Sequence, residues 1–201
     1  MAIYDHPKRI DEMDRVERKI FNKSTQDKLT EFDLVDLDIV AQIETKLDEY
    51  RYSAVGMSKR EIRIEAHQSK RLGEHLAILG DEKPHPACHA HAIVSGAHKR
   101  AARLRGILAF HKIRIDDPFN GCWLPENTNA KSLMPPRLKK AVPHSRIHRF
   151  NYYFWLRQEI NTKKTKSPDD VKYALKTIGH QLQASTQPPY VMIKKGEGIP
   201  R

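Results

Sequence analysis

The chain has 201 residues, of which 39% are apolar and 30% are charged, a balance that favours a single domain with one moderate hydrophobic core. No apolar run is long enough to span a membrane, and the first residues lack the apolar segment of a signal peptide. Two cysteines, Cys88 and Cys122, are too few for a disulfide framework or a four-cysteine zinc site. We therefore expect a protein made in the cytoplasm, without a membrane partner, that needs a dedicated machine for any export.

The formal net charge of +11 is distributed unevenly along the chain. Residues 1–50 hold 8 basic and 13 acidic side chains, a net charge of −5, whereas residues 51–201 hold 28 and 12, a net charge of +16. This division indicates an acidic N-terminal module next to a body that attracts polyanions, among which nucleic acids are the most common partners.

The first 80 residues are predicted to be helical. Apolar residues recur at helical spacing over 33–50. Ser58 and Glu61 have the spacing of a capping box at the start of a second helix, which we expect to end near Gly80. The turn-rich segment 80–87 then breaks the helical pattern.

Short strands and helices alternate in the middle of the chain. A short apolar stretch at 91–94 is followed by a glycine break and by a basic helix over roughly 97–111. The alternation in KIRIDD, residues 112–117, predicts a short strand. Residues 118–125, PFNGCWLP, predict a turn that leads into a second short strand.

The C-terminal third is again mainly helical. A proline-rich loop at 125–143 precedes a helix that we predict over 144–162. Ser167, followed by a proline and two aspartates, is a favourable N-cap for a last helix that reaches about residue 184, and an extended or mobile tail follows. Together these elements predict an α+β fold that is mostly helical.

Histidines are concentrated in two places. His144 and His148 are four residues apart, so in a helix they offer two imidazoles to one divalent ion, although two plain surface histidines are the alternative. The aromatic residues after them, in RFNYYFWL, are expected only to pack the helix into the core. His89 and His91 share one face of an extended segment, so one of them is a candidate third ligand, with ordinary polar surface as the alternative.

A third signal is the dipeptide formed by Asn120 and Gly121. A plain β-turn is its simplest interpretation. Alternatively, Asn120 holds a catalytic imidazole in its working tautomer through a side-chain or backbone hydrogen bond. Each of the three signals is weak alone, but their order along the chain is more specific.

In this order the motifs resemble the AHH branch of the HNH/endonuclease VII nucleases, which have a ββα-metal (His-Me finger) core. The family's Ala-His-His-Ile/Val motif corresponds to AHAIV at 90–94. An Ala- and Arg-rich helix and an Asn-Gly-x-x-Leu-Pro motif follow in 97–125, and PHSRIHRFNYYFWL at 143–156 is similar to the family's histidine helix. The resemblance covers about residues 86–160.

The resemblance implies a metal-dependent endonuclease with one divalent ion, which could be Mg²⁺, Zn²⁺, Mn²⁺ or Ni²⁺. It assigns His91, His144 and His148 as metal ligands and Asn120 as support for the general base. The base itself is the second histidine of the family's pair, and this chain has Ala92 at that position.

Three interpretations of Ala92 stay open. We favour an inactivated variant, because removal of a general base lowers the rate by roughly 10²–10⁴ and would protect an expression host. Alternatively, the register shifts so that His91 or His89 serves as the base. The third interpretation is a natural pseudo-enzyme that is kept for binding.

The resemblance further implies cleavage of DNA with little sequence specificity, since no base-reading module is recognisable. Basic side chains of the central helix and of the proline-rich loop are candidate contacts to the DNA backbone, and each is also compatible with a plain solvated surface. These candidates are Arg100, Arg103, Arg105, Lys139 and Lys140.

Compact nucleases of this kind commonly act as antibacterial toxins, so the resemblance implies delivery into the cytoplasm of a target cell by a type VI or contact-dependent secretion system. A cognate immunity protein and a secretion component or chaperone would be the partners. Residues 1–80 would then be a loading or scaffold segment, 81–165 the nuclease core, and 166–201 a C-terminal helix and tail. The alternatives are a phage or mobile-element endonuclease and a non-catalytic nucleic-acid-binding module.

Overall fold

The computed structural model describes residues 15–25, 28–195 and 197–199. Its fold is α+β and mostly helical, with a two-stranded antiparallel sheet, as the sequence predicts. In chain order the elements are α1 (Arg15–Ser24), α2 (Glu31–Ser53), α3 (Lys59–Ile64), α4 (Ser69–Ile78), β1 (Cys88–Ala92), α5 (Ala102–Phe110), β2 (Gly121–Pro125), α6 (Phe150–Glu159) and α7 (Pro168–Ala184). None of the described helices is long and apolar enough to cross a membrane.

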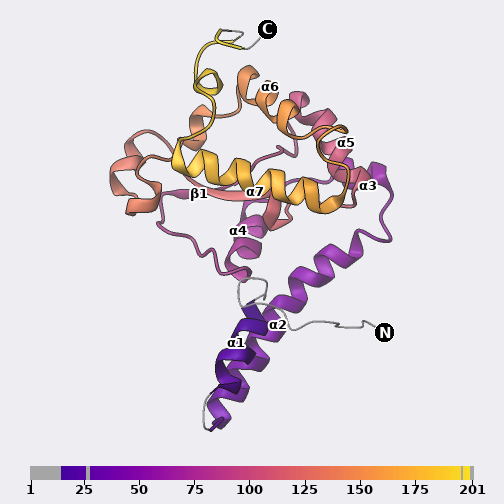
Figure 1. Cartoon of the computed structure of the whole chain (residues 1–201), viewed down its shortest axis with the longest axis vertical. Helices are drawn as coiled ribbons and strands as arrows, with labels where there is room; N and C mark the ends of the chain where they lie inside the picture. The colour runs from indigo at the N-terminus through magenta and orange to yellow at the C-terminus, as the bar shows by residue number, and fades with distance from the viewer. Residues whose placement is uncertain (1–14, 26–27, 196, 200–201) are drawn as a thin grey trace.

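The β1–β2 sheet lies between two helices. A Cβ atom on Gly121 of β2 would come within 2.7 Å of the Leu72 side chain on α4, so α4 packs closely on one face. A Cβ atom on Gly179 of α7 would lie 3.3 Å from the Cβ of Cys122, so α7 packs on the other face (Figure 1). The register pairs His91 with Cys122 and Ala92 with Gly121. Because successive residues of a strand point to opposite faces, His91 and Ala92 face different helices.

One continuous core connects the hairpin with α4, α5, α6 and α7. Its largest fully buried side chains include Trp155, Tyr152 and Tyr153 of α6. Helices α1 and α2, by contrast, extend away from this body (Figure 1). The hairpin and the start of α6 are therefore anchored in the hydrophobic core, where side chains keep defined positions.

Local capping signals place several helix starts correctly. Helices α2, α3 and α7 each begin with a capping box, formed by Thr30 and Asp33, by Ser58 and Glu61, and by Ser167 and Asp170. In each box the first side chain accepts the backbone N–H three residues on, and the acid accepts the N–H of the cap residue. The predictions of a helix over 33–50, of its successor's start at Ser58 and of the last helix are thus confirmed.

The prediction of one helix from Ser58 to Gly80 is wrong in its middle, because the chain breaks between α3 and α4. Glu65 leaves the helical conformation, with φ −53° and ψ 131°, and its carboxylate accepts hydrogen bonds from Arg71 and Arg114. The buried carboxylate of Asp116 accepts the N–H of Gln68, the N-cap residue of α4. These contacts with a distant loop replace the helical hydrogen bonds that local propensity favours.

The strand predicted at 112–117 is also absent, and the chain there is irregular. Its buried backbone groups bond to side chains instead of to a neighbouring strand. The N–H of Asp116 donates to the hydroxyl of Tyr50, its carbonyl lies 2.7 Å from Nδ1 of His75, and the carbonyl of Ile115 accepts from Asn120.

The C-terminal tail is docked and partly helical, which corrects the expectation of an extended or mobile tail. Residues Pro189–Met192 form a 3-10 helix. The amide nitrogen of Asn151 on α6 donates to the carbonyls of Tyr190 and Lys194, at 2.6 and 2.9 Å. The tail therefore closes over the start of α6.

Candidate metal centre

Three histidines from separate segments meet beside the hairpin. His91 comes from β1, His144 from a 3-10 turn (His144–Arg146), and His148 from the residues just before α6. One ring nitrogen from each can be chosen so that all three nitrogens lie within 4.8 Å of one another. The ring centroids are 5.1–5.6 Å apart. The structure thus brings together the three histidines that the sequence indicated as ligands.

His144 and His148 do not lie on one helix, which corrects the helix predicted over 144–162. Helix α6 begins at Phe150 and ends at Glu159, and Arg149 before it has an extended backbone with φ −108° and ψ 171°. The N–H of Ser145 donates to the carbonyl of Glu126, which ties the turn to the end of β2. This long-range bond holds the two histidines on a bend, where both still reach His91.

Burial keeps these histidines neutral. His91 is completely buried, and desolvation, followed by the neighbouring His148 and His144, holds its pKa well below the ordinary value of 6.5. Desolvation and the other histidines lower the pKa of His148 to about 4, and burial also lowers the pKa of His144. All three imidazoles therefore have a lone pair available at neutral pH, which is the form that binds metal ions.

One ring nitrogen of His91 is buried without a hydrogen-bond partner among the described residues. This nitrogen is Nδ1, whereas Nε2 lies 3.1 Å from the hydroxyl of Tyr152. A buried polar atom without a partner is costly, so such atoms are rare in folded proteins. A metal ion in the cluster would satisfy this nitrogen, so the residues present fit such an ion.

Two more histidines flank the cluster. The ring of His89 is exposed and its centroid lies 5.3 Å from that of His144, as expected from its place on the same strand face as His91. On the other side, the ring of His98 stacks on Tyr153 at 4.5 Å and lies 6.4 Å from the ring of His148. Nδ1 of His98 accepts the backbone N–H of the second residue after it, so this imidazole also caps the helical turn there.

Position 92 lies on the far face of β1 from this cluster. Ala92 is buried, and its partner Gly121 packs against Leu72 of α4. A histidine at position 92 would point toward α4 in this backbone, and not toward His144 and His148. Position 92 is thus directed away from the cluster in this backbone, and its assignment as the position of the general base stays a prediction.

Asn120 organises the backbone and contacts no imidazole in the described part of the chain. Its side-chain oxygen accepts the N–H of Val94, and its amide nitrogen donates to the carbonyls of Val94 and Ile115. The residue is completely buried. Through these hydrogen bonds, Asn120 fixes the backbone directly after β1 and so holds the loop that follows His91.

The residues predicted to contact DNA differ in how far their side chains are exposed or held by other contacts. Arg105 donates from one guanidinium nitrogen to the carbonyls of Ser95 and His98, so it supports the loop after β1. Arg100 lies over the ring of Phe150, close to the cluster. The remaining three are exposed: Arg103, Lys139 and Lys140.

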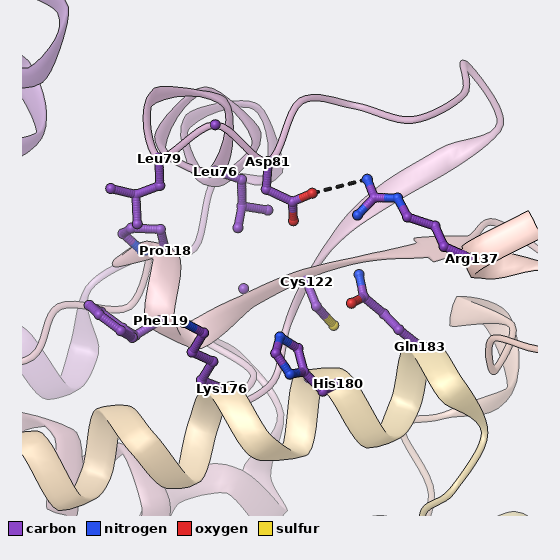
Figure 2. A pocket seen from close by; sticks show the side chains of 13 residues that line it. Leu76, Leu79, Asp81, Pro118, Phe119, Cys122, Arg137, Lys176, His180 and Gln183 are labelled. Atoms are coloured by element: carbon purple, nitrogen blue, oxygen red, sulfur yellow. Dashed lines mark hydrogen bonds and ion pairs between the residues drawn. The ribbon is translucent and has the colours of Figure 1, made fainter. Parts of the chain in front are cut away.

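A pocket of about 370 Å³, separate from the histidine cluster, lies between α4 and α7 (Figure 2). Lys176 and His180 of α7 face it from one side, and Leu79 and Phe119 face it from the other. Its potential ligands are His180, the thiol of Cys122 and the carboxylate of Asp81, which is paired with Arg137 at 3.1 Å. Among the described residues, only the three-histidine cluster brings three ligand atoms within 4.8 Å of one another, so we assign the metal centre to that cluster.

Sequence reasoning missed the two tyrosines at the start of α6. Tyr152 and Tyr153 were expected only to fill the core, but the hydroxyl of Tyr152 contacts His91, and that of Tyr153 lies 2.9 Å from Nδ1 of His148. A signal was present, because a buried tyrosine usually requires a hydrogen-bond partner. The sequence could not show that the partners are the clustered histidines.

Comparison with known families gives a match over this region. The profile of AHH, described as a nuclease family of the HNH/ENDO VII superfamily with conserved AHH, matches residues 72–182. The matched region begins in α4, ends in α7 and includes all three clustered histidines. No curated protein and no solved structure matches the chain.

Proposed function

This chain belongs to the AHH family of nucleases in the HNH/ENDO VII superfamily, and from that premise we propose that it is a metal-dependent endonuclease that hydrolyses DNA with little sequence specificity. The observation that carries the proposal is the convergence of three neutral histidines, one of which has a buried nitrogen without a partner. The proposal also agrees with the net charge of +16 over residues 51–201, which favours a polyanionic substrate.

His91, His144 and His148 would hold one divalent ion. Among the candidate ions, Zn²⁺ and Ni²⁺ suit three imidazole nitrogens better than Mg²⁺ and Mn²⁺, which prefer oxygen ligands. Three protein ligands leave a position open, as in catalytic sites. The bound ion would stabilise the negative charge that develops on the phosphate and on the leaving oxygen.

The chain's own residues would position the substrate and accept a proton. Arg100 beside the cluster, together with exposed basic side chains, would bind phosphates of the DNA backbone, while Arg105 supports the loop after β1. The attacking water must lose a proton. Of the two alternative acceptors, His91 is buried and held by Tyr152, whereas His89 is exposed beside His144, so we assign the proton acceptor to His89.

The experiment that tests this function is plasmid cleavage by the full chain. The metal-free protein is mixed with supercoiled DNA and with Zn²⁺, Ni²⁺, Mg²⁺ or Mn²⁺ in separate reactions. We expect nicked and linear products with at least one ion, strongest with Zn²⁺ or Ni²⁺, and their loss with EDTA. Binding of DNA without cleavage under every ion would instead support the non-catalytic nucleic-acid-binding module.

We also propose that the enzyme is an antibacterial toxin with a cognate immunity protein. A nuclease that acts on DNA with little specificity endangers the cell that makes it, and the basic body offers a wide surface to an acidic inhibitor that excludes DNA. The expected result is that an acidic protein encoded next to this one forms a complex with it and restores survival of an expressing host. Survival without that neighbour, or failure to form a complex at micromolar concentration, would favour the phage or mobile-element alternative.

A further inference from the structure

Two consecutive tyrosines at the start of α6 contact two different histidines of the cluster. Tyr152 and Tyr153 are both completely buried. Successive residues of a helix point about 100° apart, so the two hydroxyl groups leave the helix in different directions. That of Tyr152 reaches His91 on β1, and that of Tyr153 reaches His148 on the bend.

The hydrogen bonds of Tyr152 determine which nitrogen of His91 carries the proton. The hydroxyl of Tyr152 donates to the carbonyl of Ile93 at 2.8 Å, and it has only one proton to donate. Toward Nε2 of His91, 3.1 Å away, its oxygen therefore acts as the acceptor, so Nε2 must be the protonated nitrogen. In a neutral imidazole the other nitrogen then has the free lone pair. This nitrogen is Nδ1, the buried atom that has no partner.

Tyr153 contacts the opposite ring nitrogen of His148. Its hydroxyl lies 2.9 Å from Nδ1 of His148, and a proton on Nδ1 that is donated to this hydroxyl would leave the lone pair on Nε2. His98 covers the ring of Tyr153 from the outside, with the ring centroids 4.5 Å apart and the planes inclined by 22°. The ring of Tyr153 is thus held between the core and His98, and its hydroxyl has little freedom to leave His148.

We propose that Tyr152 and Tyr153 are positioning residues that fix two metal ligands in opposite tautomers, so that one divalent ion is bound through Nδ1 of His91 and Nε2 of His148. The proposal rests on the metal site of the proposed function and adds the nitrogen by which each ligand binds. It also gives a role to the two tyrosines of the family-like motif at 143–156, which pack the core at the same time.

The expected loss of metal affinity follows from the hydrogen bonds that each hydroxyl makes. Without the Tyr152 hydroxyl, the carbonyl of Ile93 loses its donor, and His91 loses the group that selects its tautomer. Partners that orient a ligating histidine through its second nitrogen typically contribute a factor of about 10–100 to metal affinity. The substitution Tyr152→Phe keeps the ring, and therefore most of the packing, while it removes only the hydroxyl.

The first test is zinc binding to the metal-free full chain, measured by titration calorimetry. We expect Tyr152→Phe and Tyr153→Phe to weaken Zn²⁺ binding by about 10–100-fold. Tyr173→Phe is the matched control, because Tyr173 lies on α7 and its side chain is largely exposed. This variant should bind Zn²⁺ with the affinity of the unchanged protein. Equal affinity for all four proteins, with thermal unfolding showing that each is folded, would overturn the proposal.

The second test needs no substitution and no cleavage activity. Long-range ¹H–¹⁵N NMR spectra of the imidazoles distinguish a protonated nitrogen from one with a lone pair. In the metal-free protein we expect the proton of His91 on Nε2, and after addition of Zn²⁺ we expect coordination through Nδ1 of His91 and Nε2 of His148. A metal-free His91 with its proton on Nδ1, or both histidines coordinated through Nε2, would overturn the proposal.

These measurements distinguish a failure of the positioning role of the tyrosines from a failure of the proposed nuclease function. If zinc binds as expected but DNA is not cleaved, the positioning role stands and the proposed function fails. If zinc does not bind to the unchanged protein, the metal centre fails, while the tautomer of His91 in the metal-free protein still decides whether Tyr152 acts as described.

Discussion

Replacing His144 by alanine is expected to abolish metal-dependent DNA cleavage and to weaken zinc binding by more than 100-fold, because even the loss of a residue that only orients a ligand costs about 10–100-fold. His144 supplies one of the three nitrogens that meet within 4.8 Å. It is half-buried on the turn before α6, whereas His91 is completely buried in the core. His144→Ala therefore removes a ligand with less damage to the fold than a substitution of His91.

The measurement combines zinc titration of the metal-free protein with plasmid cleavage at a fixed zinc concentration. His180→Ala is the matched control, because His180 is exposed on α7 and lies in the separate pocket (Figure 2). It should bind zinc and cleave DNA like the unchanged protein. A His144→Ala variant that is folded and retains both activities would contradict the assignment of the cluster as the metal centre.

Substitutions at the two candidate positions of the general base, 89 and 92 on β1, are expected to affect DNA cleavage differently. His89→Ala should lower the cleavage rate by roughly 10²–10⁴, the usual contribution of a general base, and should leave zinc affinity unchanged. Ala92→His should bring no gain in cleavage, because position 92 faces Leu72 and α4. An added imidazole there overpacks the core at a cost of about 1–3 kcal/mol.

The two variants, His89→Ala and Ala92→His, are checked by their rates of plasmid nicking and by their thermal unfolding curves. For a domain of this size, the overpacking of Ala92→His corresponds to a fall in Tm of roughly 2–12 °C. A folded Ala92→His protein that cleaves at least 100-fold faster, a gain of the size a general base contributes, would instead establish that the chain is an inactivated variant. An unchanged rate in His89→Ala would show that the proton acceptor lies elsewhere.

Several features of this protein could be predicted from residues that lie close together in the sequence. Capping boxes act within three residues, so the starts of α3 and α7 could be read from Ser58 and Ser167. The strand after Asn120 followed from a turn dipeptide and an apolar run. The set of three clustered histidines was implied by the resemblance to a nuclease family, whose profile matches residues 72–182.

Only the tertiary structure shows where contacts with distant segments override the local preference for a helix or a strand. The break before α4, the irregular chain around Asp116 and the late start of α6 each depend on hydrogen bonds between residues far apart in the sequence. The same holds for the site. Spacing along the chain cannot show that a Tyr152 hydroxyl selects the free nitrogen of His91, or that Ala92 faces α4, because a side chain's partners depend on which elements pack together.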